Sequence, residues 1–520
     1  MAALALVASA GCVSTRLVDL AAVQLPLPAA DPLASWQAQL AALFAQYEQA
    51  PVLAPEDQRL QPLYGGLTTL GYFGTDALPR VQDQLIPAEG AARGLPLEAA
   101  CEVAAVPSEV DAETALATTG VPRFAPVWLP LAIAGGSASD AVRCSDRGVP
   151  TGAGADASFC LFGRLALQPH GPRTLVVAAH GLFDSGAQQY MQRLAAVLYR
   201  LGHSVFVPDL RDHGDTLRAA PQLATGLGNL EGADLLASVE ALQRVCGVHI
   251  AHVGVAGVSG GGLAAIRALS LDQGGVLDAG VVALSPLLDV DAAIRDLSET
   301  GTCSVARAVE LDWVDDVLIG GAAGVAAFGG AALGQALAGR ALDADAAWVG
   351  LVGLGVGLTG ALVVDAFFDG GSQPCVAEHA IGDMVQGVLQ VRWRSLQRHA
   401  DALSPVGQRM APETVDLPAY LRERVAFSAH RRGLPLQHFD PALLSRELHA
   451  ALRGRQQARL LVIGARDDPM TRHAALESFA ARVRDLPEVY VRELSGGGHG
   501  AMWLVQPAVM QAVLERFFRR

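Results

Sequence analysis

Short apolar runs alternate with longer, amphipathic stretches of the chain from about residue 124 onward. Seven runs have strand length: SFCLFGRLAL (158–167), TLVVAAHG (174–181), SVFVPDL (204–210), IAHVGVAG (250–257), GVVALSP (280–286), RLLVIGA (459–465) and VYVREL (489–494). Helical spacing of apolar residues occurs at 188–201, 232–245, 261–271, 473–485 and 506–518. Crossovers of this length join parallel strands that are buried on both faces. The pattern therefore predicts a three-layer α/β fold with a mostly parallel sheet.

A long interruption separates the fifth run from the sixth, where an ordinary connection has only a few residues. We expect a core in two parts, 123–290 and 457–520, with a large helical cap insertion at 291–456. Residues 12–122 are rich in Ala, Leu and Pro and form a predicted N-terminal extension of unknown role, with one helical stretch at 35–49.

The predicted cap contains a Gly/Ala-rich hydrophobic hairpin at 317–364. Its two arms, 317–339 and 346–364, carry no charge, and each is near the length that crosses a bilayer. Ala and Gly drive insertion only weakly, so two alternatives stay open. The hairpin is either a lid packed over the active site that handles apolar substrate, or a segment inserted in lipid.

The first residues, MAALALVASAGC, resemble the end of a bacterial lipoprotein signal peptide at 1–11, with lipid attached to Cys12. Ser9 stands where leucine is usual, and no basic residue precedes Arg16. A frayed apolar N-terminus is the alternative. The first interpretation places the protein in the cell envelope, as an outer-membrane lipoprotein facing the periplasm, and the second in the cytoplasm.

Net charge and cysteine content limit the kinds of partner and compartment that the protein can have. The net charge of −14 argues against a nucleic-acid partner, which calls for clustered Lys and Arg. Besides Cys12 there are six cysteines, an even number that permits disulfides in an exported protein. The pairs Cys144 with Cys160 and Cys303 with Cys375 are those to test, because connectivity cannot be deduced from sequence.

One serine lies among small residues in GVSGG, residues 257–261, between the run 250–257 and a predicted helix. A GxSxG pattern between a strand and a helix is typical of a nucleophile elbow, in which Ser259 is held in a strained turn. The backbone N–H of Gly260 and that of Leu182, in the turn after TLVVAAHG, are the expected oxyanion-hole donors.

A serine nucleophile needs a base and a group that orients the base. Asp467 and Asp468 follow RLLVIGA, and His499 follows VYVREL, so both fall in loops at the ends of later strands. His180 and His213 lie in earlier loops, and we expect them to shape the site.

Four motifs follow one another along the chain, HGLFDSG, GVSGG, ARDDPM and GGGHGAM, and in this order they resemble the α/β-hydrolase superfamily. HGLFDSG (180–186), ARDDPM (465–470) and GGGHGAM (496–502) are similar to the YheT-like branch of esterases and lipases, over 158–290 and 459–520. The resemblance implies that the acid is the aspartate before proline, Asp468, whereas counting three residues from Gly464 selects Asp467. GVSGG departs from the branch, which commonly has a bulkier residue after the serine.

We therefore expect a serine hydrolase that cleaves acyl or lipid esters on Ser259, Asp468 and His499, with no cofactor and no metal. Its partner would be a small-molecule or lipid ester, with membrane association through Cys12 and, in one alternative, the hairpin. An acyltransferase with the same triad is an alternative, because an alcohol can discharge the acyl-enzyme where water is excluded. An envelope lipoprotein with a relict, non-catalytic hydrolase core is the other.

Overall fold

The computed structural model describes part of the chain, and every structural statement below concerns that part. The described residues are 35–49, 84–86, 90–105, 124–290, 292–293, 373–399, 402–421, 423–424, 441–453, 458–500, 502 and 506–519. The predicted signal peptide 1–11, Cys12 and the predicted hairpin 317–364 lie outside the described residues. None of the helices in the described part is both long and apolar enough to cross a membrane.

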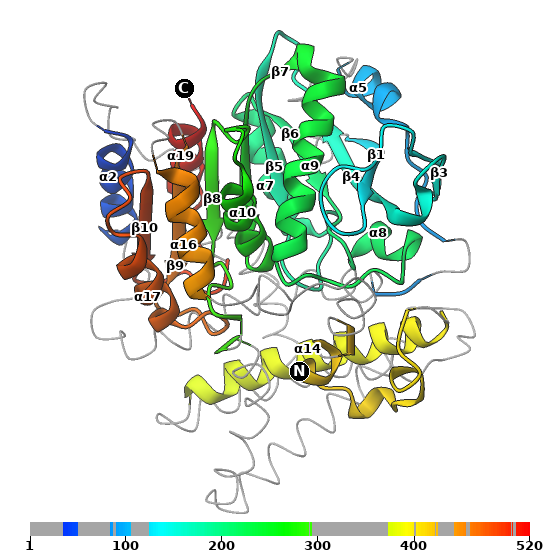
Figure 1. The fold of residues 1–520 in the computed structure, drawn as a ribbon. Coiled ribbons are helices and arrows are strands. Elements are labelled where there is room, and N and C mark those ends of the chain that lie inside the picture. The colour runs from blue at the N-terminus through cyan, green and yellow to red at the C-terminus, as the bar shows by residue number, and fades with distance from the viewer. Residues whose placement is uncertain are drawn as a thin grey trace, which may run out of the picture.

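An eight-stranded sheet forms the centre of the molecule (Figure 1). Its spatial order is β1 (Ala125–Ala132), β4 (Ser158–Ala166), β6 (Ser204–Pro208), β5 (Arg173–Ala179), β7 (Ile250–Val258), β8 (Gly280–Leu284), β9 (Leu460–Ala465) and β10 (Val489–Leu494). β4 pairs antiparallel with β1 and β6, and the remaining pairs are parallel. This order is that of the α/β-hydrolase fold, which confirms the predicted fold class.

All seven predicted runs form strands of this sheet, but β1 was not among them. Its sequence APVWLPLA carries Pro126 and Pro130, which lack the N–H needed for a ladder on both sides. β1 lies at the sheet edge, the place where prolines are tolerated. A short hairpin of β2 (Arg143–Cys144) and β3 (Pro150–Thr151) follows it.

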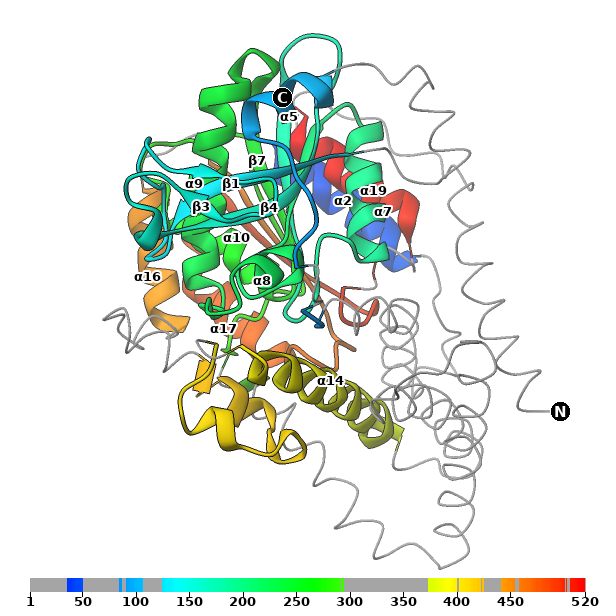
Figure 2. The ribbon, with the colours of Figure 1, turned by 90° about the vertical axis from the view of Figure 1, so that its right-hand side faces the viewer.

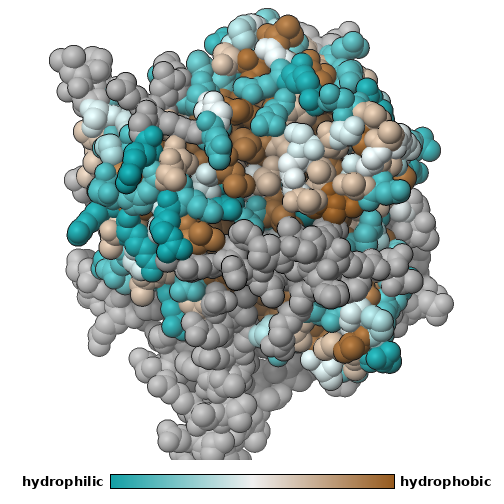
Figure 3. Space-filling model, viewed as in Figure 1, coloured by the Kyte–Doolittle hydropathy of each residue, from teal (hydrophilic) through white to brown (hydrophobic). Residues whose placement is uncertain are grey.

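Helices cover both faces of the sheet (Figure 2). One apolar cluster packs α5 (Leu97–Ala105), α9 (Asn229–Cys246), α10 (Gly260–Leu271), α16 (Pro441–Leu452) and α17 (His473–Val483) against the sheet. A second cluster, on the other face, holds α2 (Trp36–Gln49), α7 (Gln189–Arg200) and α19 (Pro507–Phe518). The five helices predicted after residue 124 are α7, α9, α10, α17 and α19. The surface over α16 and α17 is largely hydrophilic (Figure 3).

Helix α2, from the predicted N-terminal extension, is an integral part of the second cluster. It buries Leu40, Leu43, Phe44 and Tyr47, each at most 1% exposed. Burying a large apolar side chain stabilises the fold by about 1.5–3 kcal/mol. α2 therefore contributes to the core of the fold.

Two disulfides join the described residues. Cys144–Cys160, one of the pairs to test, links β2 to β4. Cys101–Cys246 links α5 to the end of α9 and was not among the predicted pairs. Cys303 lies outside the described residues, so its pairing with Cys375 stays a prediction.

The predicted cap, 291–456, includes α16, which packs against the sheet with the core helices. Its other described elements are α14 (Gln373–Gln397) and the turns η5 (Gly407–Arg409) and η6 (Pro412–Thr414). The group formed by α14 and the two turns lies below the sheet in Figure 1, at the carboxyl ends of the parallel strands. An apolar cluster joins it to the core, where Trp393 and Tyr420 pack with Phe183 and with Leu217 of α8 (Gly214–Ala219).

A buried charge cluster reinforces this junction. The Asp212 carboxylate lies 2.9 Å from Arg392 Nη2 and 2.5 Å from Arg424 Nη2. Burial alone would raise the pKa of Asp212, but the two guanidinium groups hold it below its usual value. An unpaired buried charge is costly, so the core and the insertion depend on each other here.

Candidate active site

Ser259 occupies the turn between β7 and α10, with φ 56° and ψ −120°. Such a conformation costs about 1–3 kcal/mol for a residue with a side chain. A Cβ on Gly257 would overlap the carbonyl oxygen of Gly261, and a Cβ on Gly261 would overlap the carbonyl oxygens of Ala179 and His180. These two glycines are therefore required by sterics. A Cβ on Gly260 would only approach Leu182 N to 3.2 Å, so this glycine is not.

The turn after β5 borders the serine. A Cβ on Gly181 would lie 3.6 Å from Ser259 Oγ, and the backbone nitrogen of Leu182 lies beside Gly260. Within the described part of the chain, the N–H groups of Leu182 and Gly260 donate to no acceptor. The N-terminus of α10 adds its positive end at the same place. Both N–H groups are thus available to a ligand at Ser259.

Side chains hold this turn from behind. The N–H of Gly181 donates to the Tyr190 hydroxyl at 2.9 Å, and that hydroxyl donates to Asp184 Oδ2 at 2.8 Å. The N–H of Phe183 donates to His213 Nε2 at 2.9 Å, and Phe183 itself has a positive φ of 64°. Asp184 lies within the HGLFDSG motif, but no local pattern pointed to Tyr190.

His180 and His213 use both ring nitrogens in backbone hydrogen bonds. In His180, Nδ1 donates to Gly181 O at 2.8 Å, and Nε2 accepts from the N–H of Leu210 at 3.0 Å. In His213, Nδ1 donates to Arg211 O at 2.7 Å. Burial lowers the pKa of His180, and it lowers that of His213 well below the usual value. Both rings are therefore neutral links between loops.

His499 and Asp468 form a buried pair. His499 Nδ1 lies 3.0 Å from both carboxylate oxygens of Asp468. Asp468 also accepts from the Thr471 hydroxyl at 2.5 Å and from the N–H groups of Met470 and Thr471 at 2.8 and 2.9 Å. Burial alone would raise the pKa of Asp468, but His499 and these donors hold it below its usual value. Asp468 is thus an anion that fixes the imidazole.

Asp467 has different partners. Its carboxylate accepts from the N–H of Gly498 at 2.9 Å and of Gly497 at 3.3 Å. These glycines belong to the histidine loop, residues 495–500. Asp467 therefore contacts the backbone of the loop, whereas Asp468 contacts the imidazole.

The serine elbow and the histidine loop meet at the turn after β8. The N–H of Ser259 donates to Leu284 O at 2.9 Å, and the N–H of Gly500 donates to the Ser285 hydroxyl at 3.0 Å. Ser285 has a positive φ of 43°. Among the described residues, the Ser259 hydroxyl forms no hydrogen bond, so His499 does not reach it directly in this structure.

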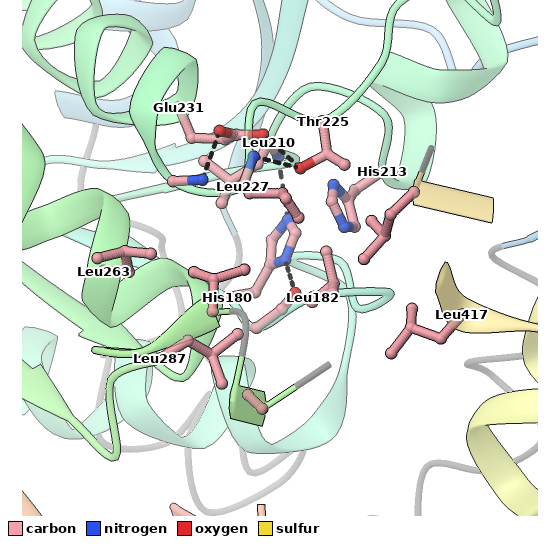
Figure 4. A pocket seen from close by; sticks show the side chains of 16 residues that line it. His180, Leu182, Leu210, His213, Thr225, Leu227, Glu231, Leu263, Leu287 and Leu417 are labelled. Atoms are coloured by element: carbon pink, nitrogen blue, oxygen red, sulfur yellow. Dashed lines mark hydrogen bonds between the residues drawn. The ribbon is translucent and has the colours of Figure 1, made fainter. Parts of the chain in front are cut away.

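A pocket opens beside the elbow (Figure 4). Leucine is the commonest residue in its walls, with Leu263 and Leu287 on the core side and Leu417 of the insertion opposite them (Figure 4). Leu182 and Gly260 also line it, so it begins at the candidate oxyanion donors.

One carboxylate, Glu231, lies in the wall of this pocket. Its oxygens accept from the Thr225 hydroxyl and from the N–H groups of Gly226 and Gly228, all at 2.7–2.8 Å. Burial raises the pKa of Glu231, against the opposing effect of Arg211. The carboxylate closes the loop before α9, a role that no motif indicated.

The chain is similar to several solved structures of esterases and peptidases. No family model and no curated protein sequence match the chain. An esterase of Pyrococcus furiosus, Pf2001, aligns over 69% of this chain and 87% of its own, with 16% identity and a TM-score of 0.36. Est1E from Butyrivibrio proteoclasticus aligns over 69% and 94%, with 12% identity and a TM-score of 0.34. An acylaminoacyl peptidase of Pyrococcus horikoshii aligns over 69% and 39%, with 12% identity and a TM-score of 0.36. The fold is identified from its own strand order, and the site from its own geometry.

Proposed function

We propose that the protein is a serine hydrolase that cleaves carboxylic esters with apolar acyl groups, using Ser259, His499 and Asp468. The observation that carries the proposal is the strained Ser259 elbow, bordered by two available N–H groups and joined through one turn to a buried Asp468–His499 pair. Catalytic hydrogen bonds are often long in the absence of substrate. An unbonded Ser259 hydroxyl is compatible with this role.

In the first half of the reaction, Ser259 Oγ would attack the ester carbonyl carbon while its proton moves to His499 Nε2. The Nδ1–H of His499 faces Asp468, which leaves Nε2 as the accepting nitrogen. The carbonyl oxygen becomes an oxyanion that the N–H groups of Leu182 and Gly260 stabilise, each donor contributing about 2.7–4 kcal/mol. The bond to the leaving alcohol then breaks, and the alcohol oxygen takes the proton from Nε2.

In the second half, water would attack the acyl group on Ser259 Oγ and give a proton to His499 Nε2. The tetrahedral intermediate collapses, the acyl–oxygen bond to Ser259 breaks, and the serine recovers its proton. A carboxylic acid leaves, and no cofactor is needed.

The pocket supports the choice of substrate. Apolar walls favour an acyl chain over a charged group, and Leu417 and Leu421 bring the insertion into contact with that chain. The resemblance of three sequence motifs to the YheT-like branch of esterases and lipases also agrees with an ester substrate.

The discriminating experiment is turnover of p-nitrophenyl esters by the wild type and by Ser259→Ala. The variant should lose activity by at least about 1,000-fold with an unchanged circular dichroism spectrum. Undiminished turnover would exclude Ser259, and an inactive wild type would favour the relict core. Transfer of the acyl group to an added alcohol in place of water would favour the acyltransferase.

The location is a separate proposal. We infer an exported lipoprotein anchored through Cys12, because two disulfides suit an oxidising compartment. Cys12→Ser should release the protein from the membrane fraction. Unchanged fractionation would point to the 317–364 hairpin as an anchor, or to no anchor.

A further inference from the structure

Helix α2 contacts the histidine loop directly, although about 450 residues separate them. The Tyr47 hydroxyl donates to Gly496 O at 3.0 Å. Glu48 Oε1 accepts from the N–H of Ser495 at 3.0 Å. Tyr47 is only 1% exposed, so its hydrogen bond is shielded from water.

The loop needs external support because of its composition. Gly497, Gly498 and Gly500 all have positive φ, at 139°, 56° and 67°. Glycine loses the most conformational freedom on ordering, so three glycines beside His499 leave the loop backbone free to move unless other groups fix it.

Two sides of the loop are held by different elements. Asp467 accepts from the N–H groups of Gly497 and Gly498. On the other side, a Cβ on Gly497 would lie 3.0 Å from the Tyr47 hydroxyl oxygen and 3.2 Å from Met502 Cβ. The backbone of 495–498 is thus clamped between the acid loop and α2.

From this clamp we infer that Tyr47 and Glu48 are positioning residues for His499, so that a helix of the predicted N-terminal extension serves the reaction. The inference rests on the proposed function. The rest of α2 is anchored elsewhere, through Gln37 Nε2 donating to Pro487 O at 2.6 Å and through Trp36 packing on Phe517 at 5.6 Å between ring centroids. Loss of the Tyr47 hydroxyl therefore leaves the helix docked.

The test compares Tyr47→Phe with Tyr199→Phe. The Tyr199 hydroxyl also donates to a backbone carbonyl, Leu167 O at 3.3 Å, on the same face of the sheet. Tyr47→Phe should lower kcat and the rate of fluorophosphonate labelling about five- to twenty-fold, a loss of about 1–2 kcal/mol for one buried hydrogen bond. KM should be unchanged. Tyr199→Phe should keep both rates.

Glu48 supplies a second arm. Glu48→Gln keeps an oxygen that can accept from Ser495 and should retain the wild-type rate. Glu48→Ala removes it and should lower kcat several-fold. Equal rates in Gln and Ala variants would exclude Glu48 from the clamp.

Hydrogen exchange of the peptide over 495–500 gives a readout that needs no activity. Exchange should be faster in Tyr47→Phe than in Tyr199→Phe. Unchanged exchange together with wild-type labelling in Tyr47→Phe would overturn the inference. If the wild type itself fails to label, the proposed function fails, and faster exchange in Tyr47→Phe alone would still support the clamp.

Discussion

The serine elbow and the histidine loop hold their side chains, Ser259 and His499, in place in different ways. Around Ser259, a buried strand, a tight turn and a helix follow one another within the stretch 250–271, and the neighbouring glycines are required because a Cβ would overlap backbone atoms. Around His499, the backbone is rich in glycine and is held by α2, the acid loop and the turn after β8.

This difference separates two kinds of constraint. The elbow is fixed by steric exclusion between backbone atoms, within its own turn at Gly257 and against the turn after β5 at Gly261, and this exclusion sustains the strain at Ser259. The histidine loop is fixed by hydrogen bonds from distant residues, each removable by one substitution. Single substitutions around the histidine loop should therefore cause partial losses of activity, whereas substitutions of the elbow glycines should cause large losses of stability.

The largest effect should come from the imidazole's own partner. Asp468→Asn should lower kcat by about 1,000- to 10,000-fold, because an amide favours the wrong tautomer of His499. Asp467→Asn keeps one accepting oxygen for the loop N–H groups and should lower kcat only about ten-fold. Ester hydrolysis by both purified variants checks the ranking. A more damaging Asp467→Asn would reverse the roles assigned to the two carboxylates.

Glycine substitutions probe the elbow. Gly257→Ala and Gly261→Ala each force a Cβ against carbonyl oxygens and should lower the free energy of unfolding by about 3 kcal/mol. Gly260→Ala is the matched control, because its Cβ would lie 3.2 Å from Leu182 N, and it should cost less than about 1 kcal/mol. Urea unfolding measures all three. Equal stability of the three variants would refute the steric account.

A substitution in the pocket wall should alter substrate preference without affecting either constraint. Leu417→Trp adds bulk to the wall that the insertion contributes. It should lower kcat/KM for octanoyl esters about ten-fold relative to acetyl esters, about 1.4 kcal/mol. Fluorophosphonate labelling should keep its rate. Equal loss for both esters would show that Leu417 supports the fold and does not contact the acyl chain.

The smallest effect concerns pH. Burial lowers the pKa of His203 to about 4, and it also lowers the pKa values of His180 and His213. The unfolded chain therefore binds protons first, so stability is present above pH 6.5 and is lost as pH falls toward 4. Between pH 6.5 and 5.5 His203 should cost about 1 kcal/mol of folding free energy, and the Tm should fall, with His180 and His213 acting in the same direction. A constant Tm over this range would show that the rings charge freely in the folded state.

Local pattern was enough to predict one of these regions and not the other. Each of the seven strands and five helices is indicated by the pattern of its own residues. The elbow around Ser259 is indicated by a short motif between one strand and one helix, so all of these could be predicted from the sequence. β1 was not predicted because Pro126 and Pro130 interrupt its strand pattern. Prolines are tolerated there only because β1 lies at the edge of the sheet. The choice between Asp467 and Asp468 stayed open because adjacent carboxylates differ only in what the fold places beside them.

The contacts of the histidine loop could not be predicted for the same reason. Tyr47 and Glu48 lie about 450 residues from the loop, in a stretch without chemical motifs. The Cys101–Cys246 pair likewise joins residues 145 apart. Only the tertiary fold brings such residues together.

The central claim is that Ser259 is a nucleophile activated by His499. Its most direct test is mass spectrometry of the intact protein and its tryptic peptides after reaction with a fluorophosphonate. The account predicts one adduct per chain, on the peptide containing Ser259, in the wild type, none in Ser259→Ala and strongly slowed labelling in His499→Gln. An adduct on another residue, or labelling of His499→Gln at the wild-type rate, would contradict it.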